Sequence, residues 1–201
     1  MSQQDRSAGW AVYYDKLRDR PPRKTVAAAL DLFGSPAADA LVIDLGCGDG
    51  RDVVEMVRRG WNVVAVDGEP TALAKLAERK MPDAERIIPT TARLEEVPLP
   101  IGLTWANSSF AMPLCEPRGF HDLWTRIREA LPAGGRFTGQ WYGQRDSWNG
   151  RPGITFVGRN EALALLEGFD LEIFEEEEAD SVTPRGNPKH WHIFHIVARK
   201  R

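Results

Sequence analysis

The stretch LVIDLGCGDGR, residues 41–51, decides the fold of this chain. Three apolar residues precede Asp44, and glycines then occupy every second position from 46 to 50. A short apolar run of this kind predicts a strand that is buried on both faces, as in a parallel sheet. Glycines after such a strand let the backbone turn sharply into a helix and let a ligand lie directly against it. We therefore expect a strand, a glycine-rich loop and a helix that together form one side of a ligand site.

The same alternation of strands and helices continues along the chain. Further parallel strands are predicted at 61–67, 86–91, 103–110 and 136–143. Helices are predicted at 6–18, 23–33, 50–59, 70–80, 119–131 and 158–167, and two long closing strands at 169–179 and 189–200. This order predicts an α/β fold with a doubly wound, seven-stranded, Rossmann-like sheet, mostly parallel, with an antiparallel C-terminal hairpin at one edge. No linker or internal repeat interrupts it, so we expect a single domain over residues 1–201, with residues 1–35 as an N-terminal helical cap.

The composition excludes several classes of function. A net charge of −3 gives no overall attraction to the phosphate backbone of a nucleic acid. No run of eighteen apolar residues is present, and the first ten residues lack the apolar core of a secretory signal. The two cysteines lie far apart, which makes a disulfide framework improbable. We therefore expect a cytoplasmic protein that binds neither membranes nor nucleic acids.

A second acid at the end of the next strand narrows the class of ligand. Asp67 follows Gly46 by 21 residues, a position from which a carboxylate can accept both hydroxyls of a ribose. A dinucleotide site requires G-x-G-x-x-G, whereas this loop is G-x-G-x-G with Arg51 in the place of the third glycine. The negative charge of Asp44 would repel a pyrophosphate but attract an ammonium or a sulfonium. S-adenosylmethionine carries both of these cations and a ribose, so we expect it as the cofactor rather than a nicotinamide dinucleotide.

The segment D-L-G-C-G-D-G-R followed by A-V-D resembles the first two motifs of class I S-adenosylmethionine-dependent methyltransferases. The likeness extends to an N-terminal W-x-x-Y-Y segment and to L-P-A-G-G-R-F before the fifth strand. The ending HIFHIVARKR looks most like that of the small tellurite-resistance-type (TehB-like) methyltransferases. The resemblance implies a methyltransferase that acts on a small-molecule acceptor.

The resemblance also implies a set of cofactor contacts. Asn107, near the end of the fourth strand, is expected at the amino-acid end of the cofactor, although Asn107 and Ser108 could instead cap the strand. Arg93 stands where class I enzymes often have an acid that binds the adenine amino group, which leaves backbone groups for this contact. Glu95 and Glu96 lie nearby, and either could substitute for that acid. The complete set of expected contacts is Tyr14, Arg23, Asp44, Gly46, Gly48, Arg51, Asp67, Gly68, Arg93, Leu94 and Asn107.

The acceptor side of the site has a weaker signal. Methyl transfer needs alignment and a dry pocket, and needs a base only when the nucleophile carries a proton, so no catalytic residue is assigned. The loop GQRDSWNG is expected to be a lid that faces the substrate. Several aromatic residues are predicted near strand ends, and they suit either the core or a pocket for an apolar, flat or polarizable acceptor. Trp105 and Tyr142 belong to this group, and the expected substrate contacts are Trp141, Arg145, Trp148 and Trp191.

The closing strands carry histidines and acids that suggest no metal site. His190 and His192 share one face of the last strand and His195 lies on the other, without a third ligand for a metal ion. The acidic run at 175–178 is expected to keep the sheet edge solvated and to pair with Lys189 or Arg199 across the hairpin.

The sequence therefore favours a methyltransferase that transfers a methyl group from S-adenosylmethionine to a small molecule, as a monomer or a homodimer. A soft oxyanion, a thiol, a natural product or a peptide could be the acceptor. The N-P-P-Y signature of enzymes that methylate nucleic-acid amino groups is absent. A non-catalytic regulatory or partner subunit that binds S-adenosylmethionine is the alternative. A nicotinamide-dependent dehydrogenase is a third possibility, which Asp44 and Arg51 disfavour.

Overall fold

The computed structural model describes residues 20–183 and 186–201. The described helices are α2 (Lys24–Phe33), α3 (Arg51–Arg58), α4 (Pro70–Ala77), α5 (Pro117–Ala130) and α6 (Arg159–Leu165), with short 3-10 turns η1 (Ala84–Arg86) and η2 (Met112–Leu114). The strands are β1 (Leu41–Leu45), β2 (Asn62–Asp67), β3 (Ile87–Thr91), β4 (Leu103–Ser108), β5 (Arg136–Gly143), β6 (Phe156–Val157), β7 (Phe169–Val182) and β8 (Pro188–Lys200). The helix expected at 6–18 lies outside the described residues, as does the larger part of the expected cap.

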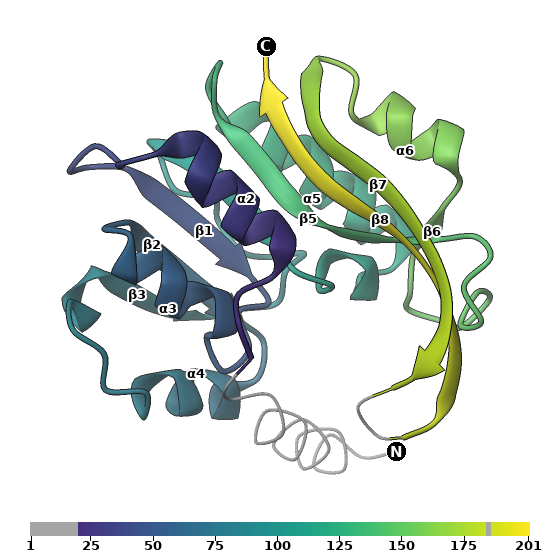
Figure 1. Ribbon diagram of the computed structural model, residues 1–201, viewed down its shortest axis with the longest axis horizontal. Helices are drawn as coiled ribbons and strands as arrows, with labels where there is room; N and C mark the ends of the chain where they lie inside the picture. The colour runs from purple at the N-terminus through teal and green to yellow at the C-terminus, as the bar shows by residue number, and fades with distance from the viewer. Residues whose placement is uncertain (1–19, 184–185) are drawn as a thin grey trace.

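The sheet has the order β3-β2-β1-β4-β5-β8-β7, as Figure 1 shows. The strands from β3 to β5 pair in parallel, whereas β8 is antiparallel to both β5 and β7. This arrangement confirms the predicted seven-stranded fold with its antiparallel edge hairpin. The two-residue strand β6, which pairs with the end of β5, was not expected because two residues carry no periodic pattern. Helix α4 ends three residues earlier than predicted and β7 runs three residues further.

The two faces of the sheet have separate cores. One core contains residues of α2, α3 and α4 and includes Met56, Trp61 and Trp105. The other contains residues of α5 and α6 and includes Trp124 and Trp141. Helices therefore cover both faces, which explains why the central strands are apolar at nearly every position. The longest described helix, α5, has 14 residues, so no described helix is long and apolar enough to cross a membrane.

The hairpin of β7 and β8 extends beyond its neighbour β5. The pairing of β5 with β8 stops at Tyr142 and Ile193, but β7 and β8 remain paired as far as Val182 and Pro188. In Figure 1 this outer half of the hairpin curves past the carboxyl ends of the parallel strands. It therefore adds a wall at the edge of the sheet where ligands of α/β proteins bind.

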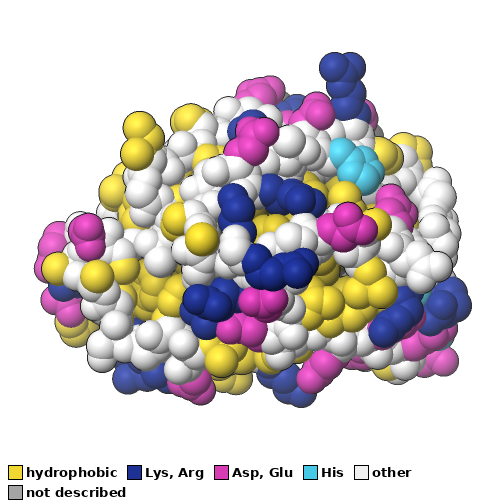
Figure 2. Space-filling view, turned by 90° about the horizontal axis from the view of Figure 1, so that it is seen from above, with side chains coloured by type: hydrophobic (Ala, Val, Ile, Leu, Met, Phe, Trp, Pro, Cys, Tyr) yellow, Lys and Arg dark blue, Asp and Glu magenta, His cyan; other side chains and the backbone are white. Residues whose placement is uncertain are grey.

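The opposite end of the molecule, seen from above in Figure 2, has a mixed surface. Lys and Arg side chains gather near the middle of this face, with Asp and Glu side chains beside them. Pairs such as Arg136 with Glu172, at 2.7 Å, place both signs of charge next to each other in this part of the sheet.

Candidate active-site cleft

A large cleft lies over the carboxyl ends of the parallel strands. It is lined by the glycine-rich loop after β1, the ends of β2 and β4, the start of α2, and the hairpin of β7 and β8. Its volume is about 2030 Å³. Sites for one small ligand commonly measure about 300–1,000 Å³, so this cleft has room for two ligands side by side. We call the part beside the glycine-rich loop the nucleoside half and the part beside the hairpin the hairpin half.

The glycine-rich loop requires glycine at two positions for packing as well as conformation. Gly46 and Gly50 have φ angles of +77° and +85°, in the left-handed region that other residues rarely adopt. A Cβ atom on Gly46 would lie 2.2 Å from Cβ of Ala111, and one on Gly50 would lie 2.2 Å from Cδ1 of Leu76. The loop therefore packs tightly from behind and leaves its backbone bare toward the cleft.

Asp67 is held by the backbone on both sides. Its Oδ2 accepts a hydrogen bond from the Gly48 N–H and its Oδ1 accepts one from the Glu69 N–H, each at 2.9 Å. Burial raises the pKa of Asp67, and these two backbone hydrogen bonds oppose that rise. Each carboxylate oxygen has a second lone pair. Asp67, 8% exposed, thus offers two fixed acceptor positions at the wall of the cleft.

Asp44 lies at one end of a buried hydrogen-bonded chain. Asn107 Nδ2 donates to Asp44 Oδ1 at 2.6 Å, and Asn107 Oδ1 accepts from the Thr138 hydroxyl at 2.6 Å. Trp105 Nε1 in turn donates to Thr138 Oγ1 at 2.8 Å. Burial, followed by the negative charge of Asp52, raises the pKa of Asp44 to about 8. The carboxyl group lines the cleft while only 2% exposed, so a cation there would favour its ionised form.

Asn107 was expected to contact the cofactor directly, and the structure corrects this. The residue is fully buried and is not among the residues that line the cleft. Both ends of its amide are bonded within the chain, so it orients Asp44 instead. The alternative interpretation as a strand-end cap fits Ser108, whose hydroxyl accepts the Met112 N–H at 2.9 Å.

Three further residues extend the nucleoside half toward the hairpin. Asp52 accepts the Arg23 N–H on one carboxylate oxygen at 2.8 Å and the Ser109 hydroxyl on the other at 2.6 Å. The Arg23 guanidinium lies 4.5 Å from the ring centroid of Phe110, a cation–π contact. Sequence reasoning missed Asp52, Ser109 and Phe110, because an acid in the first turn of a helix is ordinary and the other two follow a strand without a recognisable pattern.

The remaining predicted nucleoside contacts are divided between backbone and side chains. The Arg93 side chain is 70% exposed and lies 3.6 Å from a carboxylate oxygen of Glu95 and 3.8 Å from one of Glu96. Leu94 and Glu95 line the cleft together with Arg93, whereas Glu96 does not. Arg126 donates to the Glu95 carbonyl at 2.8 Å and so fixes this turn. Glu95 is therefore the acid nearest to where an adenine contact was expected.

Arg51 and Gly68 also line the cleft. Arg51 Nε donates to the Pro21 carbonyl at 2.6 Å and ties the start of α3 to the segment before α2. The prediction that Tyr14 reaches the cofactor falls outside the described residues.

The hairpin half has an aromatic wall, which we define as Phe110, Tyr142, Trp148 and Trp191. All four residues line the cleft. The ring centroids of Trp148 and Trp191 are 5.8 Å apart, and the Tyr142 ring lies 6.2 Å from Trp148 and 6.3 Å from Trp191. Phe110 adjoins Trp191 at 6.4 Å. The structure thus brings together Trp148 and Trp191, as expected, with two further rings.

Trp141 and Trp105 do not belong to this wall. For Trp141 this corrects the expected contact with the substrate, and for Trp105 the alternative of a core residue applies. Side chains alternate along a strand, so Trp141 points away from the face that carries Tyr142. Trp141 is fully buried against Trp124, at 5.1 Å between ring centroids. Trp105 is fully buried in the core on the other face of the sheet, 5.4 Å from Trp61.

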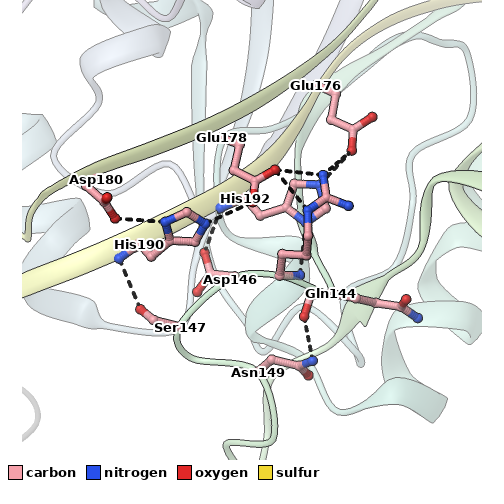
Figure 3. Close-up of polar contacts among 10 residues, drawn as sticks. Gln144, Asp146, Ser147, Asn149, Glu176, Glu178, Asp180, His190 and His192 are labelled. Carbon is pink, nitrogen blue, oxygen red and sulfur yellow. Dashed lines mark hydrogen bonds and ion pairs between the residues drawn. The ribbon is translucent and has the colours of Figure 1, made fainter.

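The expected lid, residues 143–153, is anchored to the hairpin. Asp146 forms an ion pair with Lys189, and both side chains are fully buried. Its carboxylate also accepts the Trp148 N–H at 2.9 Å and the His192 N–H at 3.3 Å. Figure 3 shows Asp146 between this loop and β8. The Lys189 ammonium lies 3.9 Å from the Trp148 ring centroid and 4.2 Å from that of Trp191, so the loop is a fixed wall.

Arg145 was expected to face the substrate, but it binds the outer side of the hairpin. Its guanidinium lies 2.8 Å from carboxylate oxygens of Glu176 and Glu178, and it is not among the cleft-lining residues. Hydrogen bonds from His192 and Arg159 lower the pKa of Glu176 to about 2. The hydrogen bond from Arg145 is the main cause that lowers the pKa of Glu178, also to about 2.

The side chains of the acidic run at 175–178 therefore alternate between the cleft side and the outer side of the hairpin. Glu175 and Glu177 line the cleft, whereas Glu176 and Glu178 hold the loop from outside. The predicted pairing of this run with Lys189 is wrong, because that ammonium is bound by Asp146. Within residues 20–183 and 186–201, no group of histidine, cysteine and acidic side chains is arranged to hold a metal ion.

Comparisons with known proteins agree with this geometry. Residues 42–135 match the family described as Methyltransferase domain, whereas no curated protein sequence matches the chain. TehB from Haemophilus influenzae is similar in structure with a TM-score of 0.76 and 17% identity, over 94% of this chain and 66% of that one. The present chain thus spans slightly less than two thirds of TehB.

For two other solved structures, the match covers a larger share of their own length. A TehB-like SAM-dependent methyltransferase from Corynebacterium glutamicum has a TM-score of 0.65 and 17% identity, over 99% of this chain and 100% of that one. The 1,6-didemethyltoxoflavin-N1-methyltransferase of Burkholderia thailandensis has a TM-score of 0.66 and 23% identity, over 96% and 86%. At these identities the likenesses show the fold.

Proposed function

We propose that this chain, whose residues 42–135 match the Methyltransferase domain family, is an S-adenosylmethionine-dependent methyltransferase that transfers a methyl group to a small-molecule acceptor. The observation that carries the proposal is the pair of fixed acids, Asp44 and Asp67, on either side of a bare glycine-rich loop. The Burkholderia thailandensis enzyme was solved with S-adenosylhomocysteine bound, which supports the same cofactor here.

The residues of the nucleoside half fit this cofactor in chemistry. Asp67 has two free acceptor positions for the ribose hydroxyls, and Asp44 supplies a carboxylate whose ionised form the ammonium group would favour. Leu94 and Glu95 supply backbone groups and a carboxylate for adenine, so that Glu95 takes the role of the acid that Arg93 replaces. We retain Arg23, Gly46, Gly48, Arg51, Gly68 and Arg93 as further proposed contacts and assign Asn107 the positioning of Asp44.

Methyl transfer requires little of the chain beyond alignment of the acceptor with the methyl donor. The sulfonium of the cofactor supplies a methyl carbon that is already activated for in-line displacement. The chain aligns the acceptor with that carbon and excludes water from the cleft, and the fixed aromatic wall suits both tasks. We propose that residues 1–201 form a single domain, because all the described strands belong to one sheet.

Calorimetric titration with S-adenosylhomocysteine tests the cofactor assignment. Substitution Asp67→Ala removes two charge-assisted hydrogen bonds to the ribose, and we expect the Kd to rise about 100-fold, or about 2.7 kcal/mol. The exposed Glu129→Gln on α5 is the control and should leave the Kd unchanged. An unchanged Kd for Asp67→Ala, or tighter binding of NADH than of S-adenosylhomocysteine, would overturn the proposal.

A non-catalytic subunit that binds the same cofactor is the alternative. The anchored aromatic wall beside the nucleoside half favours an enzyme, since a regulatory subunit has no need of a second, ring-lined half in its cleft. Formation of S-adenosylhomocysteine from S-adenosylmethionine in the presence of an acceptor distinguishes the two.

A further inference from the structure

A row of polar side chains crosses the hairpin half on three neighbouring strands. His195 on β8 pairs across the sheet with Gln140 on β5 and with Glu175 on β7, and all three residues line the cleft. His195 Nε2 lies 2.8 Å from a carboxylate oxygen of Glu177, also a cleft residue. The histidine side chain is 20% exposed, so it is accessible from the cleft yet held in place by Glu177.

This pairing determines which ring nitrogen of His195 is available. An ionised carboxylate only accepts hydrogen bonds, so Glu177 favours the neutral tautomer that carries its proton on Nε2. The other nitrogen, Nδ1, is then an acceptor, and no described residue donates a hydrogen bond to it. A histidine with one nitrogen held by a carboxylate and the other free has the arrangement of a general base.

The position of His195 joins the two halves of the cleft. Its ring lies 6.5 Å from that of Phe110 at an interplanar angle of 83°. Phe110 follows β4 and stacks on Arg23, whose backbone is bonded to Asp52 in the nucleoside half. A proton-bearing acceptor between the Phe110 ring and the hairpin would therefore stand beside the nucleoside half with His195 within reach.

Gln140 points independently to a ligand with a hydrogen-bond donor. Its Nε2 donates to the Thr25 hydroxyl at 2.9 Å, while its Oε1 is buried and has no donor among the described residues. A buried acceptor without a donor is uncommon because it costs the desolvation of that oxygen. A hydroxyl or ring N–H on the acceptor would supply the missing hydrogen bond.

The aromatic wall limits the shape and charge of the acceptor. Tyr142, Trp148 and Trp191 present rings to the cleft, and flat rings stack on such surfaces. Lys189 lies close to all three rings, with its ammonium 5.5 Å from the Tyr142 centroid and nearer to the other two. A second cation against the same rings would meet this buried charge, so the wall suits a neutral or anionic ring.

We infer that the acceptor is a flat aromatic ring with an acidic O–H or N–H, and that His195, held by Glu177, is the catalytic base that removes this proton. The inference rests on the proposed function. The acceptor oxygen or nitrogen forms a bond to the methyl carbon while the carbon–sulfur bond breaks and leaves its electron pair on sulfur. The proton moves to His195 Nδ1 and is later released to water, so the products are the methylated ring, S-adenosylhomocysteine and a proton.

Transfer of a labelled methyl group to three ring probes, 8-hydroxyquinoline, 2-naphthol and benzimidazole, tests this inference. 8-Methoxyquinoline, which has the ring without the acidic hydrogen, and 2-mercaptoethanol, a thiol without a ring, are the comparison probes. We expect transfer to at least one of the three ring probes, and none to the comparison probes. Transfer only to the thiol, or no transfer to any ring probe by a chain that binds S-adenosylhomocysteine, overturns the inference and leaves the proposed function standing.

The variant His195→Gln tests the base on the best ring probe. We expect kcat at pH 7 to fall about 100-fold or more, with KM changed less than threefold and with a rate that rises steadily with pH. Glu177→Gln should shift the pH profile of kcat, to which the charges of Glu175 and Arg23 also contribute. His190→Gln, on the opposite face of β8, is the matched control and should keep the wild-type profile.

Calorimetry with S-adenosylhomocysteine on the same variants separates the two proposals. Equal Kd values for wild type and His195→Gln, together with the loss of kcat, support the base. An unchanged kcat and pH profile in His195→Gln overturn it. Failure of the wild-type chain to bind S-adenosylhomocysteine would overturn the proposed function instead, and the inference with it.

Discussion

The two halves of the cleft are built by different means. The nucleoside half is shaped mainly by backbone, where Gly46 and Gly50 turn the chain and the Gly48 N–H fixes Asp67. The hairpin half is shaped by side chains, above all the buried pair of Asp146 and Lys189 beneath the aromatic wall. A backbone-built site needs particular residues within a short stretch, whereas a side-chain-built site can combine residues from distant parts of the chain.

The comparison predicts that breaking the buried pair damages stability more than adding one methyl group to the glycine-rich loop. Lys189→Met leaves Asp146 as a buried charge without its cation, and we expect the free energy of unfolding to fall by about 3–5 kcal/mol. Urea denaturation measures this change. The matched control is Glu178→Gln, which weakens an exposed pair on the same hairpin and should leave the free energy of unfolding nearly unchanged. Equal losses in the two variants would contradict the contrast between the halves.

The glycine-rich loop should show a smaller loss of stability but a larger loss of ligand affinity. Gly46→Ala adds a methyl group in contact with Ala111 at a φ of +77°. We expect a cost of about 2–4 kcal/mol, from about 1 for the left-handed conformation and about 1–3 for overpacking. Gly102→Ala, with a φ of +81° and open space around it, measures the conformational part alone. If both variants lose the same stability, the packing behind the loop is unimportant.

The last predicted effect is a dependence on pH that has opposite signs for stability and binding. Because the pKa of Asp44 is raised from 3.8 to about 8, the native chain holds a proton that the unfolded chain has released. Its contribution to the free energy of unfolding is therefore complete below about pH 4, falls as pH rises toward 8, and is flat above. Cofactor affinity should rise over the same range, at most about tenfold per pH unit, because the ammonium group favours the ionised carboxylate.

Asp44→Asn serves as the reference for both measurements. Denaturation and calorimetry at pH 5, 6, 7 and 8 should show that the wild-type slopes are absent in this variant. Parallel slopes in wild type and variant would mean that another group titrates.

The same contrast explains how much could be predicted from sequence. The strands, the sheet with its edge hairpin, and Asp44, Gly46 and Asp67 as cleft residues followed from local patterns, because each residue's neighbours in the chain are also its neighbours in space. Asn107 was assigned wrongly because its position at a strand end does not tell whether its amide faces a ligand or the next strand.

The hairpin half was largely beyond sequence reasoning. Trp141 and Tyr142 occupy a strand that is buried on both faces, so their types do not reveal which of them faces the cleft. The partner of Lys189 depends on how the loop at 143–153 folds against β8, a contact across 43 residues. His195 and Glu177 came to light only through the register of β7 against β8, which decides which half of the acidic run faces inward.

The overhang of the β7–β8 hairpin also bears on how such a chain can change its substrate. Lengthening the hairpin by two residues in each strand would deepen the wall and keep every existing side chain on its present side. An odd insertion in one strand would reverse that strand, sending His195 outward or exchanging Glu177 for Glu176. The glycine-rich loop shares no strand with this hairpin. Insertions of an even number of residues in the hairpin can therefore change the choice of acceptor during evolution without altering the binding of the methyl donor.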